Sequence, residues 1–400
     1  MMVVSLGIYI SVPFCRTKCS YCNFASDVFS RAVFERYVDR VCADIADAEE
    51  AVKQMADRIE RNVDSIYLGG GTPTVLDSDQ LKRIFEAVRA QFFVTPDAEI
   101  TVECAPGTLK PDALETLLNC GVNRVSLGVQ SFIDAEAAAV GRLHKRATIL
   151  DDISRLRSSG ITNINIDLIA GLPHQIMESW SESLAECIAT GAAHVSVYML
   201  EVDDDSRLGR ELIAGGTRYH AHFVPYEDAI ADFYGIACER LDTAGVSQYE
   251  ISNFARVGFK SLHNLKYWTR QPYLGFGVDA HSMLPSSSPG LEAVRFATAD
   301  SLEKYVAGSL LQKTEISAAA ALEEMFFLGL RLNHGVDLNE VARTCTPVEL
   351  EFYRSIIAEL VSDGLLEQHE TRICLTVRGR LLSNEVFQRF LAPAVPSNRI

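Results

Sequence analysis

The chain reads Cys15-Arg-Thr-Lys-Cys-Ser-Tyr-Cys-Asn-Phe24 shortly after an apolar run, Leu6 to Val12, that has the character of a buried strand. Cys15, Cys19 and Cys22 follow the spacing C-x3-C-x2-C. Three thiolates in one loop can bind three corners of a cubane [4Fe–4S] cluster and leave its fourth iron without a protein ligand. S-adenosylmethionine can chelate that iron through its amino and carboxylate groups, and an electron from the cluster can then break a C–S bond. The spacing therefore predicts a cluster with one open iron.

Two other interpretations of these cysteines stay open at this point. A zinc site needs a fourth ligand, and no C-x2-C or H-x3-H partner follows in the sequence. Single cysteines are common in protein cores, although three within one short loop are unusual. The other cysteines stand singly, which is typical of a reducing compartment where a labile cluster can survive.

Length and charge narrow the class of protein. A chain of 400 residues is long enough for one large catalytic domain and a smaller one. Its formal net charge of -16 argues against a nucleic-acid partner, because phosphate binding needs a concentrated basic face. No apolar run approaches the roughly 18 residues of a membrane helix. We therefore expect a cytoplasmic protein, for which peripheral contact with the inner membrane stays open.

Beyond the cysteine loop, apolar strand patterns alternate with helical patterns, which indicates βα units and a parallel sheet. About six such units predict an α/β fold, an incomplete (β/α)6 barrel of the TIM type, with functional residues at the carboxyl ends of its strands. From about Ser301 the pattern is mainly helical with a short β-like run, which predicts a winged-helix-like module. We expect the barrel over residues 1–245, a connecting segment with a hairpin over 246–300, and the C-terminal domain over 301–400.

Polar residues close or follow several of the predicted strands. The glycines of Gly69-Gly-Gly-Thr-Pro73 would let the backbone approach a ligand closely. Glu103 ends the next strand, where its carboxylate can accept hydrogen bonds from ribose hydroxyls or from an ammonium group; an exposed strand-end Glu is the plainer alternative. Asp167 lies in an otherwise apolar strand, where a charge is costly unless a polar ligand or a cation such as Arg142 pairs with it.

The residues around the cysteine loop closely resemble the radical-SAM superfamily, since Tyr9-Ile-Ser-Val-Pro-Phe leads into Cys15 and Tyr21-Cys-Asn-Phe24 ends the loop. The nearer resemblance is to the coproporphyrinogen dehydrogenase-like branch and, within it, to the HemW family of haem chaperones. The dehydrogenases carry a further Cys where Phe24 stands, and a long extension where only fourteen residues precede Cys15 here. The run His263-Asn-Leu-Lys-Tyr-Trp268 resembles the H-N-x-x-Y-W signature of HemW-like proteins.

The resemblance implies roles for individual residues. It implies that the three loop cysteines bind the cluster and that His263, which shares a helix face with Tyr267, contacts haem. Packing of these rings at a domain junction is the alternative for His263. We expect His144, His174 and His194 to be structural. The positions that the resemblance assigns to S-adenosylmethionine are Tyr9, Tyr21, Gly70, Gly71, Thr72, Glu103, Gln130, Arg142 and Asp167.

As a whole, the resemblance implies a haem chaperone that binds the cluster, S-adenosylmethionine and haem. It would deliver haem to membrane-bound haem-requiring enzymes such as those of the respiratory chain, and it could form a homodimer. No catalytic residue is assigned. The alternative within the superfamily is an oxygen-independent coproporphyrinogen III dehydrogenase, which oxidatively decarboxylates a porphyrin precursor. A haem carrier with a purely structural cluster and a zinc-binding regulator are alternatives from other classes.

Overall fold

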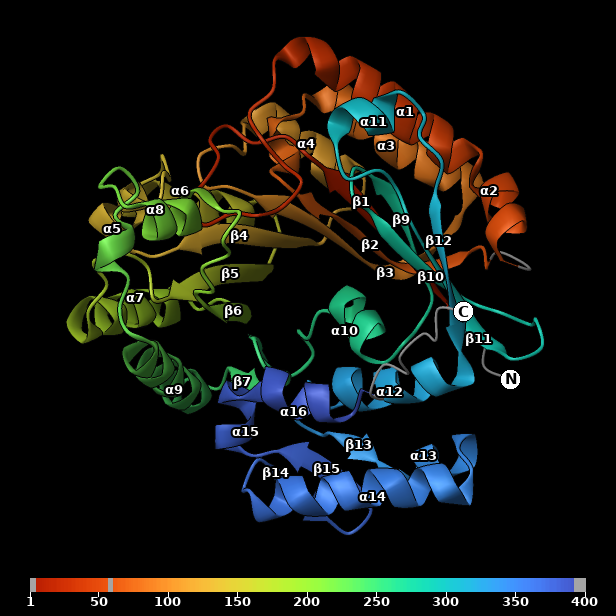
Figure 1. The fold of residues 1–400 in the computed structure, drawn as a ribbon. Coiled ribbons are helices and arrows are strands. Elements are labelled where there is room, and N and C mark those ends of the chain that lie inside the picture. Colours follow the sequence, from red (N-terminus) through yellow and green to blue (C-terminus); the bar gives the residue numbers. More distant parts are fainter. Residues whose placement is uncertain (1–4, 57–59, 392–400) are drawn as a thin grey trace.

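A strongly curved sheet forms the centre of the molecule (Figure 1). The computed structural model describes residues 5–56 and 60–391, so positions 1–4, 57–59 and 392–400 of the predicted domains lie outside the described residues. Six parallel strands follow one another in the sheet in chain order, which confirms the predicted incomplete barrel. They are β1 (Leu6–Val12), β2 (Asn62–Gly70), β3 (Phe93–Cys104), β4 (Arg124–Gln130), β5 (Asn163–Ala170) and β6 (His194–Met199).

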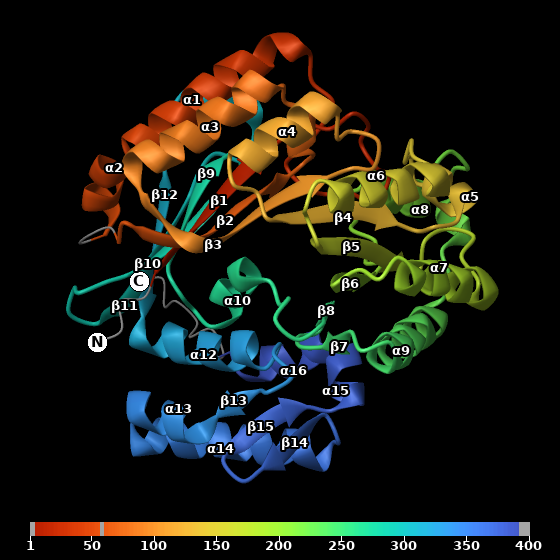
Figure 2. The ribbon, with the colours of Figure 1, turned by 180° about the vertical axis from the view of Figure 1, so that it is seen from behind.

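Helices cover the convex face of this sheet, as the two opposite views show (Figures 1 and 2). The main apolar core lies between these helices and the strands. Among the described residues, no helix is long and apolar enough to cross a membrane. The helices of this part are α1 (Phe34–Ala46), α2 (Ala48–Met55), α3 (Ser78–Gln91), α4 (Pro111–Asn119), α5 (Asp134–Ala139), α6 (Arg146–Ser158), α7 (Met177–Ala189), α8 (Arg207–Ala214) and α9 (Glu227–Thr243).

The concave face of the sheet is polar, whereas the interior of a closed TIM barrel is filled mainly by branched apolar side chains. Along β4, Arg124, Ser126 and Gln130 line the cavity inside the arc. The residues between them, among them Val125 and Leu127, belong to the core under the helices. Because side chains alternate across a strand, one strand can supply both the apolar core and a polar cavity wall.

Segments after the barrel extend the same sheet at both edges. β9 (Tyr273–Gly277) pairs in parallel with β1, and the antiparallel strands β10 (His281–Pro285), β11 (Leu291–Ala297) and β12 (Gln312–Ser317) continue from it. At the other edge, β8 (Asn253–Ala255) pairs with β6 and with β7 (Ser247–Gln248). The helix α10 (Leu262–Trp268) lies in the opening of the arc (Figures 1 and 2). The short helix α11 (Leu302–Val306) connects β11 to β12.

The C-terminal part has a core of its own, in which Phe326 lies 4.6 Å between ring centroids from both Tyr353 and Phe390. Its elements follow the winged-helix order of helix, strand, two helices and a β-hairpin, which confirms the predicted winged-helix-like module. They are α12 (Ala318–Gly329), β13 (Val336–Asp337), α13 (Leu338–Thr344), α14 (Pro347–Ser362), β14 (Leu366–His369) and β15 (Arg372–Leu375), followed by α15 (Val377–Leu381) and α16 (Ser383–Arg389).

A buried ion pair network joins this part to the sheet. The Glu324 carboxylate of α12 lies 2.9 Å from Arg270 Nε and 2.8 Å from Arg295 Nη1, and its side chain is 6% exposed.

We expect Glu324→Ala to lower the free energy of unfolding by about 3 kcal/mol, because two guanidinium groups lose their partner at once. Urea unfolding followed by tryptophan fluorescence measures this change. Trp268 reports on the same junction, because Arg331 Cζ lies 4.3 Å from the centre of its ring. Glu315→Ala, which removes only an exposed pair with Lys313, is the control and should cost at most about 0.5 kcal/mol; an equal loss would contradict the buried network.

Candidate cofactor site at the carboxyl ends of the strands

The cysteine loop is held in place by backbone hydrogen bonds to three different parts of the fold. Cys15 N, where the loop begins, donates to Asp27 O, where the chain returns after the loop, at 3.0 Å. Ser20 N donates to Val140 O after α5 at 3.2 Å, and Leu208 N of α8 donates to Ser20 O at 2.8 Å. Because the loop has no regular secondary structure, these contacts determine where its thiols point.

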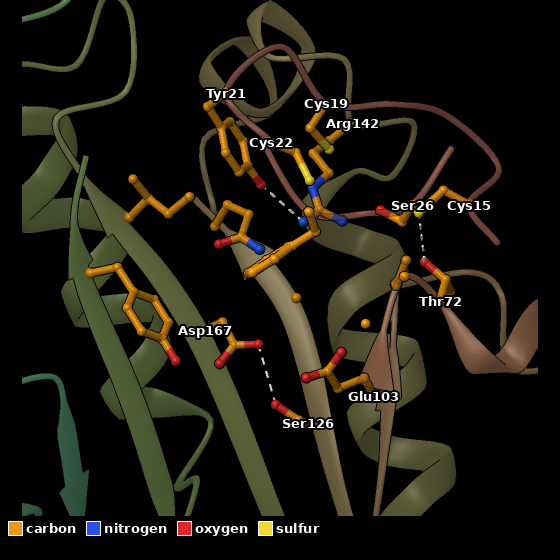
Figure 3. A pocket seen from close by; sticks show the side chains of 18 of the residues that line it. Cys15, Cys19, Tyr21, Cys22, Ser26, Thr72, Glu103, Ser126, Arg142 and Asp167 are labelled. Carbon is orange, nitrogen blue, oxygen red and sulfur yellow. Dashed lines mark hydrogen bonds between the residues drawn. The ribbon is translucent and has the colours of Figure 1, made fainter. Parts of the chain in front are cut away.

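All three loop thiols line one cavity of about 610 Å³ inside the arc, and none of them forms a disulfide. Figure 3 shows Cys19 and Cys22 beside Arg142, with Cys15 on the other side near Thr72. Within residues 5–56 and 60–391, no three His, Cys, Asp or Glu side chains converge on a point where a single metal ion could bind. Thiols that share a cavity without converging on one point suit a multi-iron cluster better than a zinc ion.

The electrostatics of the loop fit a group that binds thiolates. Burial raises the pKa of the Cys15 thiol; hydrogen bonds with Ser26 and Thr72 oppose this shift, and the nearby Cys22 and Cys19 add to it. Three thiolates close together repel one another, so a positively charged iron cluster would stabilise the deprotonated forms and release protons on binding. The donor set therefore fits an iron–sulfur cluster by its chemistry.

The glycine turn lies beside the loop. Gly70 has a φ of +95°, which L side chains rarely adopt. A Cβ on Gly71 would meet the Phe14 carbonyl oxygen at 2.7 Å, so only glycine fits against the end of β1. Gly70, Gly71 and Thr72 all line the cavity, and the Thr72 hydroxyl lies 4.0 Å from Cys15 Sγ. The turn thus exposes backbone to the space next to the thiols.

Glu103 faces this cavity from the end of β3. Its carboxylate accepts a hydrogen bond of 2.8 Å from the Tyr67 hydroxyl. Burial raises its pKa to about 7, to which the nearby Asp167 adds, while the Tyr67 hydrogen bond, Gly70 and Arg124 act in the opposite direction. A carboxyl group half-protonated at neutral pH becomes a full carboxylate when a cation binds beside it, so Glu103 is suited to an ammonium group.

Asp167 lies opposite Glu103 across the cavity (Figure 3). Its carboxylate accepts hydrogen bonds from Ser126 Oγ at 3.2 Å and from Asn165 Nδ2 at 2.7 Å. Burial raises the pKa of Asp167, and the hydrogen bonds from Asn165, Ser196 and Ser126 oppose the shift. The partner suggested from the sequence, Arg142, forms no ion pair with it. Neighbouring polar side chains of the barrel therefore compensate this charge.

Arg142, Tyr21 and Gln130 form the wall between the cysteine loop and the strands. Arg142 donates from Nη2 to the Tyr21 hydroxyl at 3.0 Å, and its Nε is buried without a partner among the described residues. Gln130 Oε1 is likewise buried and without a partner there. The residue has a φ of +69° where β4 shifts register against β5, which turns its side chain inward. Buried donors and acceptors left unpaired are suited to a polar ligand in the cavity.

The structure does not bring Tyr9 and His263 to this cavity. The Tyr9 ring lies 6.2 Å from that of Tyr67 and 6.3 Å from that of His263, behind the cavity wall. His263 is 1% exposed, and its two ring nitrogens already bond the hydroxyls of Ser65 at 3.0 Å and Tyr267 at 2.8 Å. Burial, with Lys266 and Arg124 as smaller causes, lowers its pKa to about 3. As folded, His263 offers no free nitrogen to a ligand.

Several cavity residues escaped the sequence reasoning. Tyr67, Ser126 and Asn165 hydrogen-bond the two carboxylates, and Asn264 of the H-N-x-x-Y-W run reaches the cavity in place of its neighbouring His. Arg124 lies on the cavity wall, 1% exposed, and its Nε has no partner among the described residues. A signal for most of these existed, because polar residues alternate with apolar ones along β4 and β5.

Comparison with known proteins agrees with this arrangement. The model of the radical SAM superfamily matches residues 9–187, and that of the HemN C-terminal domain matches residues 316–382. The heme chaperone HemW of Bacillus subtilis is 32% identical over 387 residues, which cover 96% of this chain and 98% of that protein. The chain belongs to the HemW family. The heme chaperone HemW of Escherichia coli is 29% identical and is matched over 98% of its length.

The fold of this HemW-family chain is also that of a related enzyme. Coproporphyrinogen III oxidase (HemN) from Escherichia coli superposes with a TM-score of 0.81 over 97% of this chain and 90% of that one, at 24% identity. Membership in the radical SAM superfamily implies a [4Fe–4S] cluster and S-adenosylmethionine as cofactors. The HemW-family cysteine loop and the polar cavity are where such cofactors would fit.

Proposed function

We propose that this chain is a haem chaperone that holds a [4Fe–4S] cluster through Cys15, Cys19 and Cys22. It would bind S-adenosylmethionine in the same cavity, bind haem, and deliver haem to membrane-bound haem-requiring enzymes such as those of the respiratory chain. The observation that carries the proposal is that the three thiols, the glycine turn and two facing carboxylates share one cavity. Relatives of nearly the same length bear the name heme chaperone HemW.

The roles of the cavity residues follow from their positions. The cluster, when bound, supplies an electron to the sulfonium of S-adenosylmethionine. Gly70, Gly71 and Thr72 would hold its methionyl part against the backbone, and Glu103 would accept hydrogen bonds from its ammonium or ribose groups. The remaining polar contacts would come from Tyr21, Gln130, Arg142 and Asp167. Tyr9 would act from behind the wall by supporting Tyr67 and Glu103.

A haem titration tests the chaperone proposal. Ferric haem is added to the anaerobically reconstituted protein, and the Soret absorbance is expected to saturate at one haem per chain. Size-exclusion chromatography of the same samples, with and without cluster, tests the proposed homodimer. Adding coproporphyrinogen III, S-adenosylmethionine and a reductant should yield no protoporphyrinogen; its formation would instead assign the chain to the dehydrogenases.

The same titration examines the haem contact that the sequence suggests for His263. We expect His263→Ala to leave haem affinity within about threefold, because both ring nitrogens are used inside the fold. The variant should instead lose about 2 kcal/mol of stability, since the hydroxyls of Ser65 and Tyr267 lose their partner in a buried site. Thermal unfolding measures that loss. A large loss of haem affinity at unchanged stability would restore His263 as the haem ligand.

A further inference from the structure

Two histidines meet on the surface at the carboxyl ends of β5 and β6, outside the cofactor cavity. His174 Nε2 lies 3.0 Å from His220 Nδ1, and the His174 ring stacks on Phe223 with 4.1 Å between centroids. Both histidines have left-handed backbone angles, with φ of +68° and +62°. His174 N also donates to Phe223 O at 2.9 Å, so the pair is held by backbone as well as by side chains. Non-glycine residues in this conformation cluster at functional sites.

The hydrogen bond between the rings can prepare His220 as a ligand. When His220 Nδ1 is the donor to His174 Nε2, the lone pair of His220 Nε2 is left free. No residue of the described chain forms a hydrogen bond with that nitrogen. Metal-binding histidines usually donate their second ring nitrogen to a neighbouring acceptor, which sets both the tautomer and the orientation of the ring. His174 occupies the place of that acceptor.

An apolar groove lies beside His174. His220 is not among the residues that line this groove, but its ring lies 6.2 Å between centroids from that of Phe223, which does line it. His174, Ile176, Phe223 and Tyr226 line a groove of about 590 Å³ beside α7 and α9, and the last three are exposed. Exposed Ile213 lies on α8, which packs against the segment of His220 through Glu211; the Glu211 carboxylate accepts from Tyr219 N and Ala221 N. Exposed apolar side chains gathered in one groove, here Ile176, Phe223 and Tyr226, indicate a binding surface.

We propose that this surface binds haem, with His220 as an axial ligand of the iron and His174 as the residue that orients it. The inference rests on the proposed chaperone function and adds the place of haem binding to it. A porphyrin supplies four nitrogens to its iron, so one imidazole from the protein is sufficient, and the absence of a three-ligand site in the described chain does not oppose it. The flat apolar porphyrin would lie on Phe223 and the neighbouring apolar side chains.

The position of the surface links it to the cofactor cavity. The first turn of α8 contacts the cysteine loop, through Leu208 N to Ser20 O at 2.8 Å and Arg207 Nη1 to Lys18 O at 3.1 Å. Haem bound beside the C-terminal end of α8 would therefore be separated from the cysteine loop by this one short helix. The two cofactors would occupy neighbouring sites on the same face of the barrel.

Titration of ferric haem into reconstituted variants tests the assignment. We expect His220→Asn to weaken haem binding roughly 100-fold and His174→Ala roughly tenfold, with loss of the imidazole-ligated Soret spectrum in the first. Asparagine is used at position 220 because it tolerates the left-handed conformation and so keeps the loop intact. Added free imidazole should restore the spectrum of His220→Asn. His222→Ala and His369→Ala, which alter an adjacent and a distant exposed histidine, are the controls and should bind haem as the unmodified chain does.

The possible outcomes separate the two proposals. If the unmodified chain binds no haem, the chaperone function itself fails. If it binds haem and both His220→Asn and His174→Ala bind it equally well, the function stands and this site is wrong. Loss of binding in His263→Ala alone would move the haem site to the interior of the arc.

Discussion

The variant with Cys15, Cys19 and Cys22 all replaced by alanine is expected to contain no iron–sulfur cluster after anaerobic reconstitution. The unmodified chain should bind about four irons and turn brown, because a [4Fe–4S] cluster needs these three thiolates. Among the described residues, no three His, Cys, Asp or Glu side chains converge on one point, so the fold offers no single-ion site that could replace them. Iron and sulfide analysis with the visible absorption spectrum measures the effect. The fold should survive, since the loop is held mainly by backbone hydrogen bonds.

Cys104→Ala is the matched control for this experiment. Cys104 lines the same cavity, yet burial raises the pKa of its thiol to about 12, so it stays protonated and is a poor ligand. This variant should bind as much iron as the unmodified chain. Four irons in the triple-alanine variant, or their loss in Cys104→Ala, would contradict the assignment of the ligands.

Glu103→Gln is expected to weaken S-adenosylmethionine binding by roughly 10- to 100-fold, the effect of losing a hydrogen bond to a charged group. The pH dependence identifies the cause. In the ligand-free protein the pKa of Glu103 is about 7. A bound cation would lower that pKa, so ligand binding releases a proton at pH values between the pKa of the bound form and that of the ligand-free form. Affinity should therefore rise with pH up to about 7 in the unmodified chain and stay flat over the same range in Glu103→Gln. Equilibrium dialysis of the reconstituted proteins at several pH values measures both effects.

The same substitution should stabilise the ligand-free protein. The folded pKa of Glu103 lies above its ordinary value of 4.5, so its stabilising contribution is complete below pH 4.5 and is lost as pH rises through about 7. At pH 8 the buried charge is a cost, and Glu103→Gln should raise the free energy of unfolding by about 1–3 kcal/mol. Glu86→Gln, on the exposed face of α3, is the control and should change little. If Glu103→Gln is less stable than the unmodified chain, or if the unmodified chain binds S-adenosylmethionine with an affinity that does not depend on pH, this role of Glu103 is contradicted.

A substitution that stabilises the empty protein while weakening ligand binding is the signature of a residue retained for its ligand. The same reasoning applies to Arg142 and Gln130, each of which has one buried polar atom, Nε and Oε1 respectively, without a partner within the described chain. Such groups cost free energy until a ligand satisfies them. The cavity therefore has the properties of a binding site whose polar groups are fully paired only when a ligand is bound.

Much of the fold was readable from local patterns. The alternation of strands and helices predicted the parallel sheet, and the cysteine spacing predicted a loop after β1, because both depend on residues close together in the chain. The same reasoning placed Glu103, Gln130 and Asp167 near strand ends, where parallel strands bring them to one edge. It missed two partners of these residues, Tyr67 and Ser126, because each of these pairings joins two different strands.

The histidines show the limit of that reasoning most clearly. A motif suggested His263 as a ligand, but the packing of α10 inside the arc uses both of its nitrogens, and its neighbour Asn264 reaches the cavity instead. His174 and His220 lie 46 positions apart and carry no motif, and only the fold brings their rings together. The sequence by itself determined the family, the order of strands and the cysteine loop, since these are encoded by short-range spacing. Which side chains are buried, paired or free was decided by the tertiary structure, because hydrogen bonds and burial depend on neighbours that are distant along the chain.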